Sequence, residues 1–193
     1  MKNTGSDVPG ELDAASQSPG NAGGLRVVVM GVSGCGKSEI GHRLAARLGV
    51  DYLEGDAFHP ASNVAKMSAG IPLDDDDRSG WLGVLADQVA AACGDDRGLV
   101  LSCSSLKRRY RDLLRAGDPE LLFIHLHGER DTIAARMQSR PGHFMPPALL
   151  DSQLRDLEPL QPDEHGFQVD IRHSPDDLIA QIMQRCNEVK KAS

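Results

Sequence analysis

One stretch of the sequence decides the fold of this chain, and it reads Gly31-Val32-Ser33-Gly34-Cys35-Gly36-Lys37-Ser38. The stretch fits the pattern G-x-x-x-x-G-K-[ST], in which glycines allow backbone N–H groups to turn inward around a phosphate. An apolar run at 25–30 precedes it, and a segment with apolar residues at four-residue steps follows it. Because this motif requires a buried strand before it and a helix start after it, the sequence predicts a phosphate-binding loop.

The loop is predicted to bind the phosphates of ATP. All eight residues are expected to contribute, because their N–H groups and the positive end of the following helix face the anion. Lys37 is expected to reach the β- and γ-phosphates and to act in catalysis, and the Ser38 hydroxyl to bind Mg²⁺. Cys35 is interpreted as a small residue that fits the loop. The alternative is a reactive thiol that acts as a redox switch.

Strands and helices alternate through the rest of the chain. Strands are predicted at 25–30, 51–54, 99–103, 121–126 and 167–171, and helices at 36–48, 60–70, 78–93, 105–116, 130–139, 148–157 and 176–190. This alternation predicts an α/β fold of three layers, with helices on both faces of a five-stranded parallel sheet. Residues 1–24 are rich in Gly, Ser, Pro and Ala, so they are predicted to be a disordered tail before one domain at 25–193.

Charge and composition exclude several classes of protein. The formal net charge of the 193 residues is −7, which argues against a nucleic-acid binder and means that an anion site needs a local group of cations. No apolar run approaches the roughly 18 residues that span a membrane, and the first residues contain no apolar h-region, so we expect neither a secretory signal nor a membrane partner. Four cysteines without a C-x-x-C pair suggest a reducing compartment, and we predict a cytoplasmic protein.

Two acids follow the second predicted strand, whereas the third strand ends without one. Glu54 and Asp56 are two positions apart, so their side chains are expected to point the same way if the strand continues. We expect one carboxylate to orient a metal-bound water and the other to face the acceptor hydroxyl. Glu54 is assigned to the metal water, and Asp56 to the acceptor side as the candidate base. Ordinary surface acids at a strand end are the alternative.

From residue 55 onward the sequence contains several blocks that are more specific than any general motif. They read GDAFHPASNVAKM at 55–67, GIPL at 70–73, DR at 77–78, WL at 81–82, CSSLKRRYRD at 103–112, HFMP at 143–146, LLDSQ at 149–153 and LE at 157–158. Together they closely resemble the gluconokinases, which share a fold with shikimate and nucleoside monophosphate kinases. The resemblance covers about residues 26–173. It implies ATP-dependent phosphorylation of D-gluconate at its 6-hydroxyl, a sheet order of 2-3-1-4-5 and a homodimer.

Gluconate is an anion with many hydroxyls, so its site needs cations and short polar groups. The residues predicted to bind it are Asp56, His59, Lys66, Arg78, Lys107, Arg111 and, from the resemblance, His143. Arg108 and Arg109 complete the basic cluster but could equally form a solvated helix face. The acidic run 74–77 is interpreted as a helix cap, with which Arg78 could pair instead of substrate. His125 and His127 are interpreted as a partly buried, hydrogen-bonded pair, with a metal pair as the alternative.

A helical lid is predicted at about 130–157. Arg136 and Arg140 are four positions apart and share a helix face just before the proline-bounded turn 141–147. In the related kinases such arginines close on the transferring phosphate, where they stabilise charge and exclude water, so both are assigned to catalysis. Surface arginines that pair with Glu129 and Asp131 are the alternative.

Two other functions compete with this interpretation. A kinase of another small hydroxy acid, such as shikimate, would carry the same loop and fold. A nucleotide-dependent binding switch would begin with the same loop, but it would need an N-K-x-D guanine motif, which this sequence lacks.

Overall fold

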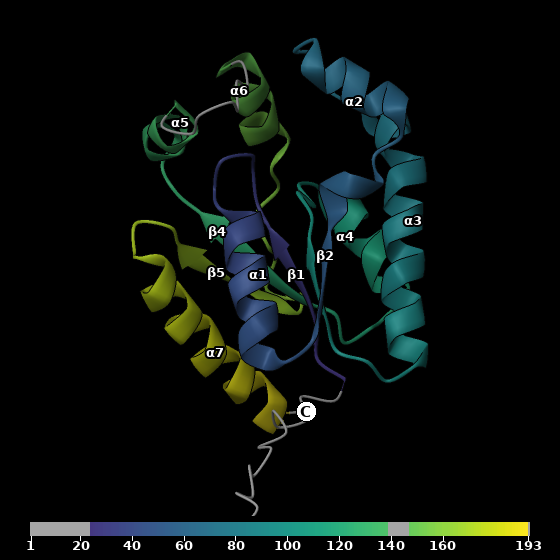
Figure 1. The fold of residues 1–193 in the computed structure, drawn as a ribbon, viewed down its shortest axis with the longest axis vertical. Coiled ribbons are helices and arrows are strands. Elements are labelled where there is room, and N and C mark those ends of the chain that lie inside the picture. Colours follow the sequence, from purple (N-terminus) through teal and green to yellow (C-terminus); the bar gives the residue numbers. More distant parts are fainter. Residues whose placement is uncertain (1–23, 139–146, 193) are drawn as a thin grey trace, which may run out of the picture.

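The chain folds around a parallel sheet that carries helices on both faces (Figure 1). The computed structural model describes residues 24–138 and 147–192. Its strands are β1 (Arg26–Met30), β2 (Asp51–Glu54), β3 (Leu99–Ser102), β4 (Leu122–His127) and β5 (Gly166–Asp170). All neighbouring pairs are parallel, in the order β2-β3-β1-β4-β5. The predicted fold class and strand order are therefore confirmed. The predicted tail at 1–24 falls almost entirely outside the described residues.

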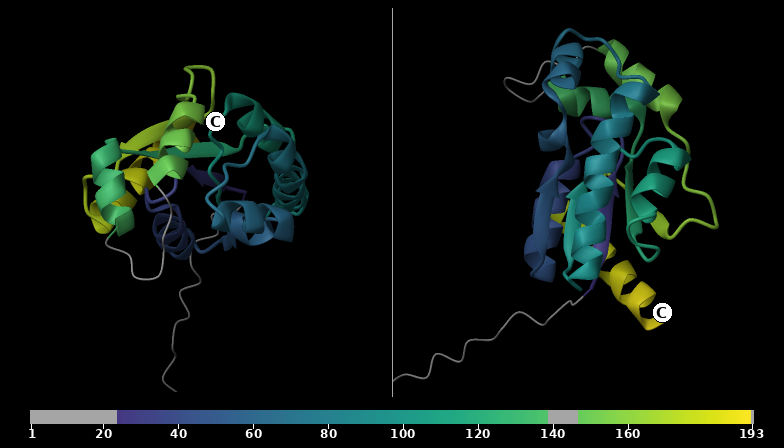
Figure 2. Two further views of the ribbon diagram at one scale, coloured as in Figure 1. Left: turned by 90° about the horizontal axis from the view of Figure 1, so that it is seen from above. Right: turned by 90° about the vertical axis from the view of Figure 1, so that its right-hand side faces the viewer.

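Strand β1 is buried on both faces, which explains its unbroken apolar run. Val27 and Val29 pack with α1 (Lys37–Leu48) and α7 (Pro175–Ala192), whereas Val28 and Met30 pack with α3 (Asp75–Gly94) and α4 (Arg108–Arg115). The sheet thus separates two apolar clusters, and Figure 2 shows the helices on either side of it. Each fully buried side chain of this size contributes about 1.5–3 kcal/mol. The strand before the loop is therefore held firmly in the centre of the domain.

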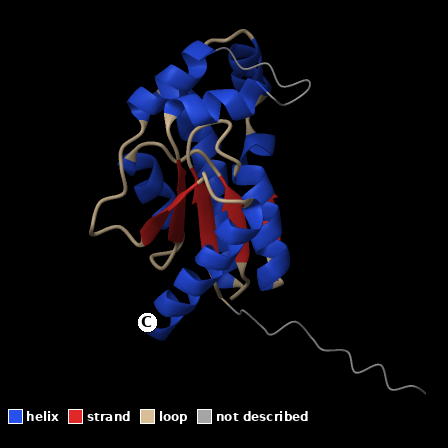
Figure 3. Cartoon of the chain, turned by 90° about the vertical axis from the view of Figure 1, so that its left-hand side faces the viewer, coloured by secondary structure: helices blue, strands red, loops and turns tan. Residues whose placement is uncertain are grey.

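A third set of helices lies beyond the carboxyl ends of the strands. The short 3-10 helix η1 (Gly55–Phe58) and α2 (Ala61–Ser68) stand on one side, and α5 (Arg130–Gln138) and α6 (Pro147–Asp156) on the other. Figure 3 shows these helices above the red strands. Ligands of parallel sheets bind at this edge, so these helices are the walls of any site.

The structure shifts the starts of two predicted helices. Helix α3 begins at Asp75 because Asp74 and Asp77 form a capping box, each side chain accepting a hydrogen bond from the backbone of the other. This confirms the interpretation of the acidic run as a cap. Helix α4 begins only at Arg108, because Ser105 adopts a positive φ of 45° that a helix cannot contain.

Arg111 is part of the interior and not of a binding site, so its prediction as a substrate-binding residue is wrong. Its side chain is 0% exposed, and its guanidinium donates to the Glu164 carboxylate from Nε to Oε1 (2.6 Å) and from Nη2 to Oε2 (2.8 Å). Nη1 donates to the carbonyl oxygens of Ser105, Leu106 and Glu158. These bonds join the connection between β3 and α4 to the segment that leads into β5. Sequence spacing could not reveal this, because an arginine at the start of a helix usually faces solvent.

Replacing Glu164 by Gln should destabilise the fold strongly, because Arg111 would then be buried without a counter-charge. We expect a loss of about 3–5 kcal/mol of unfolding free energy at pH 7. Burial favours a raised pKa for Glu164, but the hydrogen bonds from Arg111 outweigh it and lower the pKa to about 2. The carboxylate therefore stabilises the fold fully above its unfolded pKa of about 4.3 and loses this effect as the pH falls toward 2.

Urea denaturation across this pH range measures the difference between wild type and Glu164→Gln, which should shrink with acidification. Asp163→Asn is the matched control, because Asp163 is the neighbouring acid and pairs with Arg108 at the exposed surface. The control should change stability little. Equal effects of the two variants would contradict the assignment.

Candidate functional site

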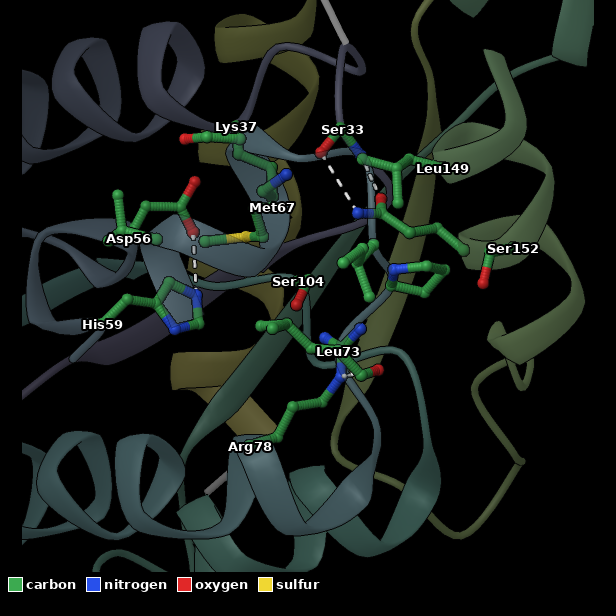
Figure 4. Close-up of a pocket in the computed structure, with 15 residues that line it drawn as sticks. Ser33, Lys37, Asp56, His59, Met67, Leu73, Arg78, Ser104, Leu149 and Ser152 are labelled. Atoms are coloured by element: carbon green, nitrogen blue, oxygen red, sulfur yellow. Dashed lines mark hydrogen bonds and ion pairs between the residues drawn. The ribbon is translucent and has the colours of Figure 1, made fainter. Parts of the chain in front are cut away.

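A cavity of about 310 Å³ opens at the carboxyl edge of the sheet, between the predicted phosphate loop and the helices beyond it (Figure 4). This volume lies at the lower end of the range of small-molecule sites, about 300–1,000 Å³. Its polar lining comes from segments far apart in the sequence, namely Ser33, Lys37, Asp56, His59, Ser68, Arg78, Ser104, Ser152 and Gln153. Its apolar lining consists of Val64, Met67, Ile71, Pro72, Leu73 and Leu149.

The loop after β1 has the backbone of a phosphate cradle. Gly31, Gly34 and Gly36 have φ angles of 139°, 82° and 101°, which turn successive N–H groups inward and which other residues rarely adopt. At Gly34 a Cβ would also collide with Met137 of α5, so no larger residue fits there. Lys37 lies across the loop, and its Nζ donates to the carbonyl oxygen of Val32 at 3.1 Å. The residues present therefore suit the phosphates of a nucleotide.

Two residues predicted to bind the nucleotide face the core with their side chains. Val32 and Cys35 are buried among the residues of the α1 and α7 face, so only their backbone groups can contribute to the cradle. Burial raises the pKa of the Cys35 thiol, although Lys37 acts in the opposite direction. A thiol in this state is a poor nucleophile. The structure therefore favours the interpretation of Cys35 as a small residue that fits the loop.

Glu54 lies at the end of β2, within a network of hydroxyl groups. Tyr52 donates to its Oε2 at 2.8 Å, and Ser102 of the neighbouring strand donates to its Oε1. Burial favours a raised pKa for Glu54, but hydrogen bonds from Ser102, Ser38 and Tyr52 outweigh it and lower the pKa. The carboxylate is thus ionised beside the Ser38 hydroxyl. Oxygen donors of this kind suit Mg²⁺, so the residues present fit the implied ion.

The strand does not continue as far as Asp56, so the condition under which Glu54 and Asp56 were expected to point the same way is not met. Strand β2 ends at Glu54, and the chain turns at once into η1. Gly55 packs so closely against the carbonyl oxygen of Ser102 that a Cβ there would collide with it, and Trp81 Nε1 donates to the Gly55 carbonyl at 2.8 Å. The turn leaves Glu54 beside the loop and places Asp56, 67% exposed, on the cavity.

The predicted cations separate into two groups. His59 and Arg78 line the cavity, as expected. Arg78 is buried, its Nε donates to the Leu73 carbonyl at 3.4 Å, and it forms none of the ion pairs found among the described residues. The alternative in which Arg78 pairs with the acidic run is therefore not what the structure shows.

The remaining cations are held by acids outside the cavity. Lys66 Nζ donates to both carboxylate oxygens of Asp77, at 2.5 and 2.7 Å. Lys107 Nζ lies 3.0 Å from Asp75 Oδ1, and Arg109 pairs with the same carboxylate. Arg108 forms a bidentate pair with the exposed acid Asp163. Within the described chain, neither Lys66 nor Lys107 lines the cavity.

The predicted lid is described only in part. Arg136 of α5 donates to the carbonyl oxygen of Ile171, and Arg130 pairs with Asp151 of α6 at 2.7 Å and with Asp131 at 3.3 Å. Arg140 and His143 lie outside the described residues. The structure thus brings Lys37, Asp56, His59 and Arg78 to one cavity, and Arg136 is not among the described residues that line it.

Several lining residues escaped the sequence prediction. Gln153 of α6 is the clearest, because its Oε1 accepts from the backbone N–H of Ser33 at 2.7 Å and its Nε2 donates to Ser33 Oγ at 3.3 Å. Ser104, Ser152 and the apolar wall were missed as well. Gln153 stands in one of the blocks that carry the family resemblance, so that block was the available signal. The residues of the apolar wall also stand in these blocks, although their apolar character alone does not mark them as part of a site.

The two histidines of β4 form no metal centre in the part of the chain that the structure describes. His125 is buried, which lowers its pKa to about 4, and its ring centroid lies 6.1 Å from that of His127. Residues 24–138 and 147–192 hold no group of three or more His, Cys, Asp or Glu placed to bind a metal ion.

In the same residues, no helix is both long enough and apolar enough to cross a membrane.

The relatives found by comparison with known proteins agree with one another. A family model described as shikimate kinase matches residues 33–187. The thermosensitive gluconokinase of Escherichia coli (strain K12) is 46% identical over 166 residues, which cover 86% of this chain and 87% of that protein. The gluconokinase of Gluconobacter oxydans (strain 621H) is 44% identical over 158 residues, covering 82% and 89%. The crystal structure of a gluconokinase from Sinorhizobium meliloti 1021 superposes with a TM-score of 0.79 at 40% identity, covering 88% and 98%.

Alkylation of the native protein at pH 8 should modify Cys93 first. Cys93 is half-buried, whereas Cys35, Cys103 and Cys186 are buried, and burial raises the pKa of Cys103 to about 11. Mass spectrometry after timed exposure to iodoacetamide gives the rate at each cysteine, with denatured protein as the control in which all four should react. Modification of native Cys35 as fast as Cys93 would contradict this assignment and revive the redox switch.

Proposed function

Because the chain belongs to the gluconokinases, within the shikimate kinase family of P-loop proteins, we propose that its cavity binds D-gluconate next to ATP. It transfers the γ-phosphoryl group to the 6-hydroxyl, giving 6-phospho-D-gluconate and ADP. One observation carries the proposal: the phosphate cradle with Lys37 and the carboxylate of Asp56 line the same cavity. A donor site and an acceptor site therefore share one space.

The acceptor half of the cavity suits a polyhydroxylated anion. Arg78 is a buried cation without a carboxylate partner among the described residues, so it can pair with the carboxylate of gluconate. Asp56 is assigned to the 6-hydroxyl, whose proton it accepts as the hydroxyl oxygen attacks phosphorus. His59, Ser104 and Ser152 supply hydrogen-bonding groups for the other hydroxyls. The apolar wall excludes water that would otherwise accept the phosphoryl group.

Ser38 and Glu54 are the residues that would hold Mg²⁺, Ser38 through its hydroxyl and Glu54 through a water. The ion, when bound, neutralises charge on the β- and γ-phosphates. Lys37 and the loop N–H groups position the phosphates, and charge stabilisation of this kind supplies most of the rate in phosphoryl transfer. The lid boundaries of about 130–157 and the catalytic roles of Arg136 and Arg140 remain predictions, as do contacts of Lys66, Lys107 and His143 with substrate.

The homodimer, the cytoplasmic location and the boundary between tail and domain at residue 24 are likewise predictions. Light scattering coupled to size-exclusion chromatography measures the first directly, since a dimer doubles the mass of 20.7 kDa. Nothing else in the proposed reaction depends on these three points.

A substrate panel tests the proposed function. ADP release should be fastest with D-gluconate when sugar acids, polyols, shikimate and nucleosides are compared at equal concentration with ATP and Mg²⁺. The physical reason is the combination of a cation for the carboxylate with a carboxylate for the distal hydroxyl. Equal or faster release with shikimate would support the alternative hydroxy-acid kinase. Nucleotide binding without transfer to any acceptor would support the binding switch instead.

Two acid variants should separate the two carboxylates. Asp56→Asn should lower kcat by about 100-fold or more through loss of the base, with nucleotide binding little changed. Glu54→Gln should instead raise the Mg²⁺ concentration needed for tight nucleotide binding by about tenfold or more, since the water-held ion loses its anionic partner. Calorimetric titration of nucleotide at several Mg²⁺ concentrations measures the second effect without turnover. Wild-type turnover in Asp56→Asn would remove the assignment of Asp56.

A further inference from the structure

Asn63 is a buried amide at a position where a helix usually places an apolar residue. It is 2% exposed and is the buried residue of α2, whose other residues are half-buried or exposed. Its Nδ2 donates to the backbone carbonyl oxygen of Asp77 at 2.7 Å and lies 3.4 Å from His59 Nδ1. The amide therefore stands between the start of α3 and the histidine of the cavity.

The hydrogen-bond chemistry of this amide determines which ring nitrogen of His59 carries the proton. A backbone carbonyl oxygen can only accept, so the atom of Asn63 that faces Asp77 has to be the NH₂ group and not the oxygen. The second N–H of that group is then directed at His59 Nδ1. Nδ1 has to present a lone pair to it, because two donors would otherwise face each other. The proton of neutral His59 consequently sits on Nε2.

The imidazole is fixed in orientation as well. Its ring stacks on Trp81 with centroids 4.0 Å apart and an interplanar angle of 20°, and its side chain is 4% exposed. Trp81 is in turn anchored to Gly55 through its indole N–H. With Nδ1 toward Asn63, Nε2 faces the cavity and lies 3.9 Å from Asp56 Oδ1 (Figure 4). The N–H of His59 is thus presented to the carboxylate and to any hydroxyl beside it.

We propose that Asn63 is a positioning residue that holds His59 as the Nε2–H tautomer, so that Asp56 faces a hydrogen-bond donor and not a competing base. The role of this tautomer in turnover rests on the proposed function. A neutral Nε2–H can donate to Asp56 or to a substrate hydroxyl, but it cannot take the proton that Asp56 accepts. The acceptor hydroxyl therefore has a single base available to it.

The charged groups around His59 agree with this state. Burial lowers the pKa of His59, Asp56 of η1 acts in the opposite direction, and Arg78 of α3 lowers it further. Lys66 of α2 and Asp77 of α3 lie close by and neutralise each other as an ion pair. Protonation of Nδ1 would also break the contact with Asn63, whose amide cannot rotate without turning its oxygen toward the Asp77 carbonyl.

The tautomer can be read directly from long-range ¹H–¹⁵N spectra of the full chain at pH 8, without substrate. We expect a lone-pair Nδ1 and a protonated Nε2 for His59, assigned with His59→Gln. His165 is the internal control with the opposite tautomer, since its Nδ1 lies 3.0 Å from the carbonyl oxygen of Glu120 and has to donate to it. A protonated Nδ1 on His59 in the wild type would overturn the proposal, whether or not the protein phosphorylates gluconate.

Two variants test the role of Asn63. Asn63→Asp, nearly isosteric, should move the proton to Nδ1, because a carboxylate there accepts. It should raise the pKa of His59, and shift the acidic limb of the kcat/KM profile for gluconate to higher pH. Asn63→Ala should give a mixture of tautomers and lower kcat/KM for gluconate about tenfold, as expected for one lost hydrogen bond to a buried group, with the KM for ATP little changed.

A purely structural role predicts a different result. In that case Asn63→Ala would be less stable but would keep the wild-type tautomer and pH profile, and this outcome would overturn the proposal. If Asn63→Asp does not fold, the wild-type spectrum and the Asn63→Ala variant still decide whether Asn63 sets the tautomer of His59. A chain that shows the expected tautomers but no gluconate turnover would refute the proposed function and leave the assignment of Asn63 to His59 intact.

Discussion

The close packing of Gly55 against the carbonyl oxygen of Ser102 determines what the carboxyl edge of the sheet can do. It ends β2 abruptly and sends two acids, only two residues apart, to different places. Glu54 remains in the hydroxyl network beside the phosphate loop, whereas Asp56 reaches the cavity. Trp81 then holds the Gly55 carbonyl on one side and the ring of His59 on its face. The turn at this close backbone contact therefore places Glu54, assigned to the metal, and Asp56, assigned to the acceptor, in different parts of the site.

Several of the cations near the cavity of this acidic chain are paired with carboxylates. The run of aspartates at the start of α3 caps that helix and also binds Lys66, Lys107 and Arg109. In the structure these three cations are thus already paired with carboxylates. Arg78, from the same helix, keeps its guanidinium on the cavity without an acid partner in the described chain. Among the described cations that line the cavity, the guanidinium of Arg78 is therefore a buried group that our proposal can assign to the carboxylate of the acceptor.

The sequence predicted the fold well because its signals are local. The unbroken apolar run of β1, the glycines of the loop and the alternation of elements each report on neighbouring residues. The failures are non-local. Arg111 looked like a member of a basic cluster, because its partner Glu164 lies 53 positions away and no spacing rule connects them. Glu54 and Asp56 would share a face only if β2 continued, and the turn that ends it packs against Ser102, on another strand. Gln153 was missed because its partner Ser33, bonded through both its N–H and its hydroxyl, lies 120 positions away.

Arg111 and Asn63 show how buried polar side chains support a site that they do not line. Each donates to backbone carbonyls of segments far away in the sequence or in another element: Arg111 to those of Ser105, Leu106 and Glu158, and Asn63 to that of Asp77. An apolar residue would pack with a smaller desolvation cost but would lose these hydrogen bonds. Because a hydrogen bond fixes direction as well as distance, each side chain allows one arrangement of the segments that it joins. In our interpretation, burying each polar side chain costs some free energy of folding but fixes the geometry of the segments that it joins. Arg111 does this beneath the connection after β3, and Asn63 does it behind His59.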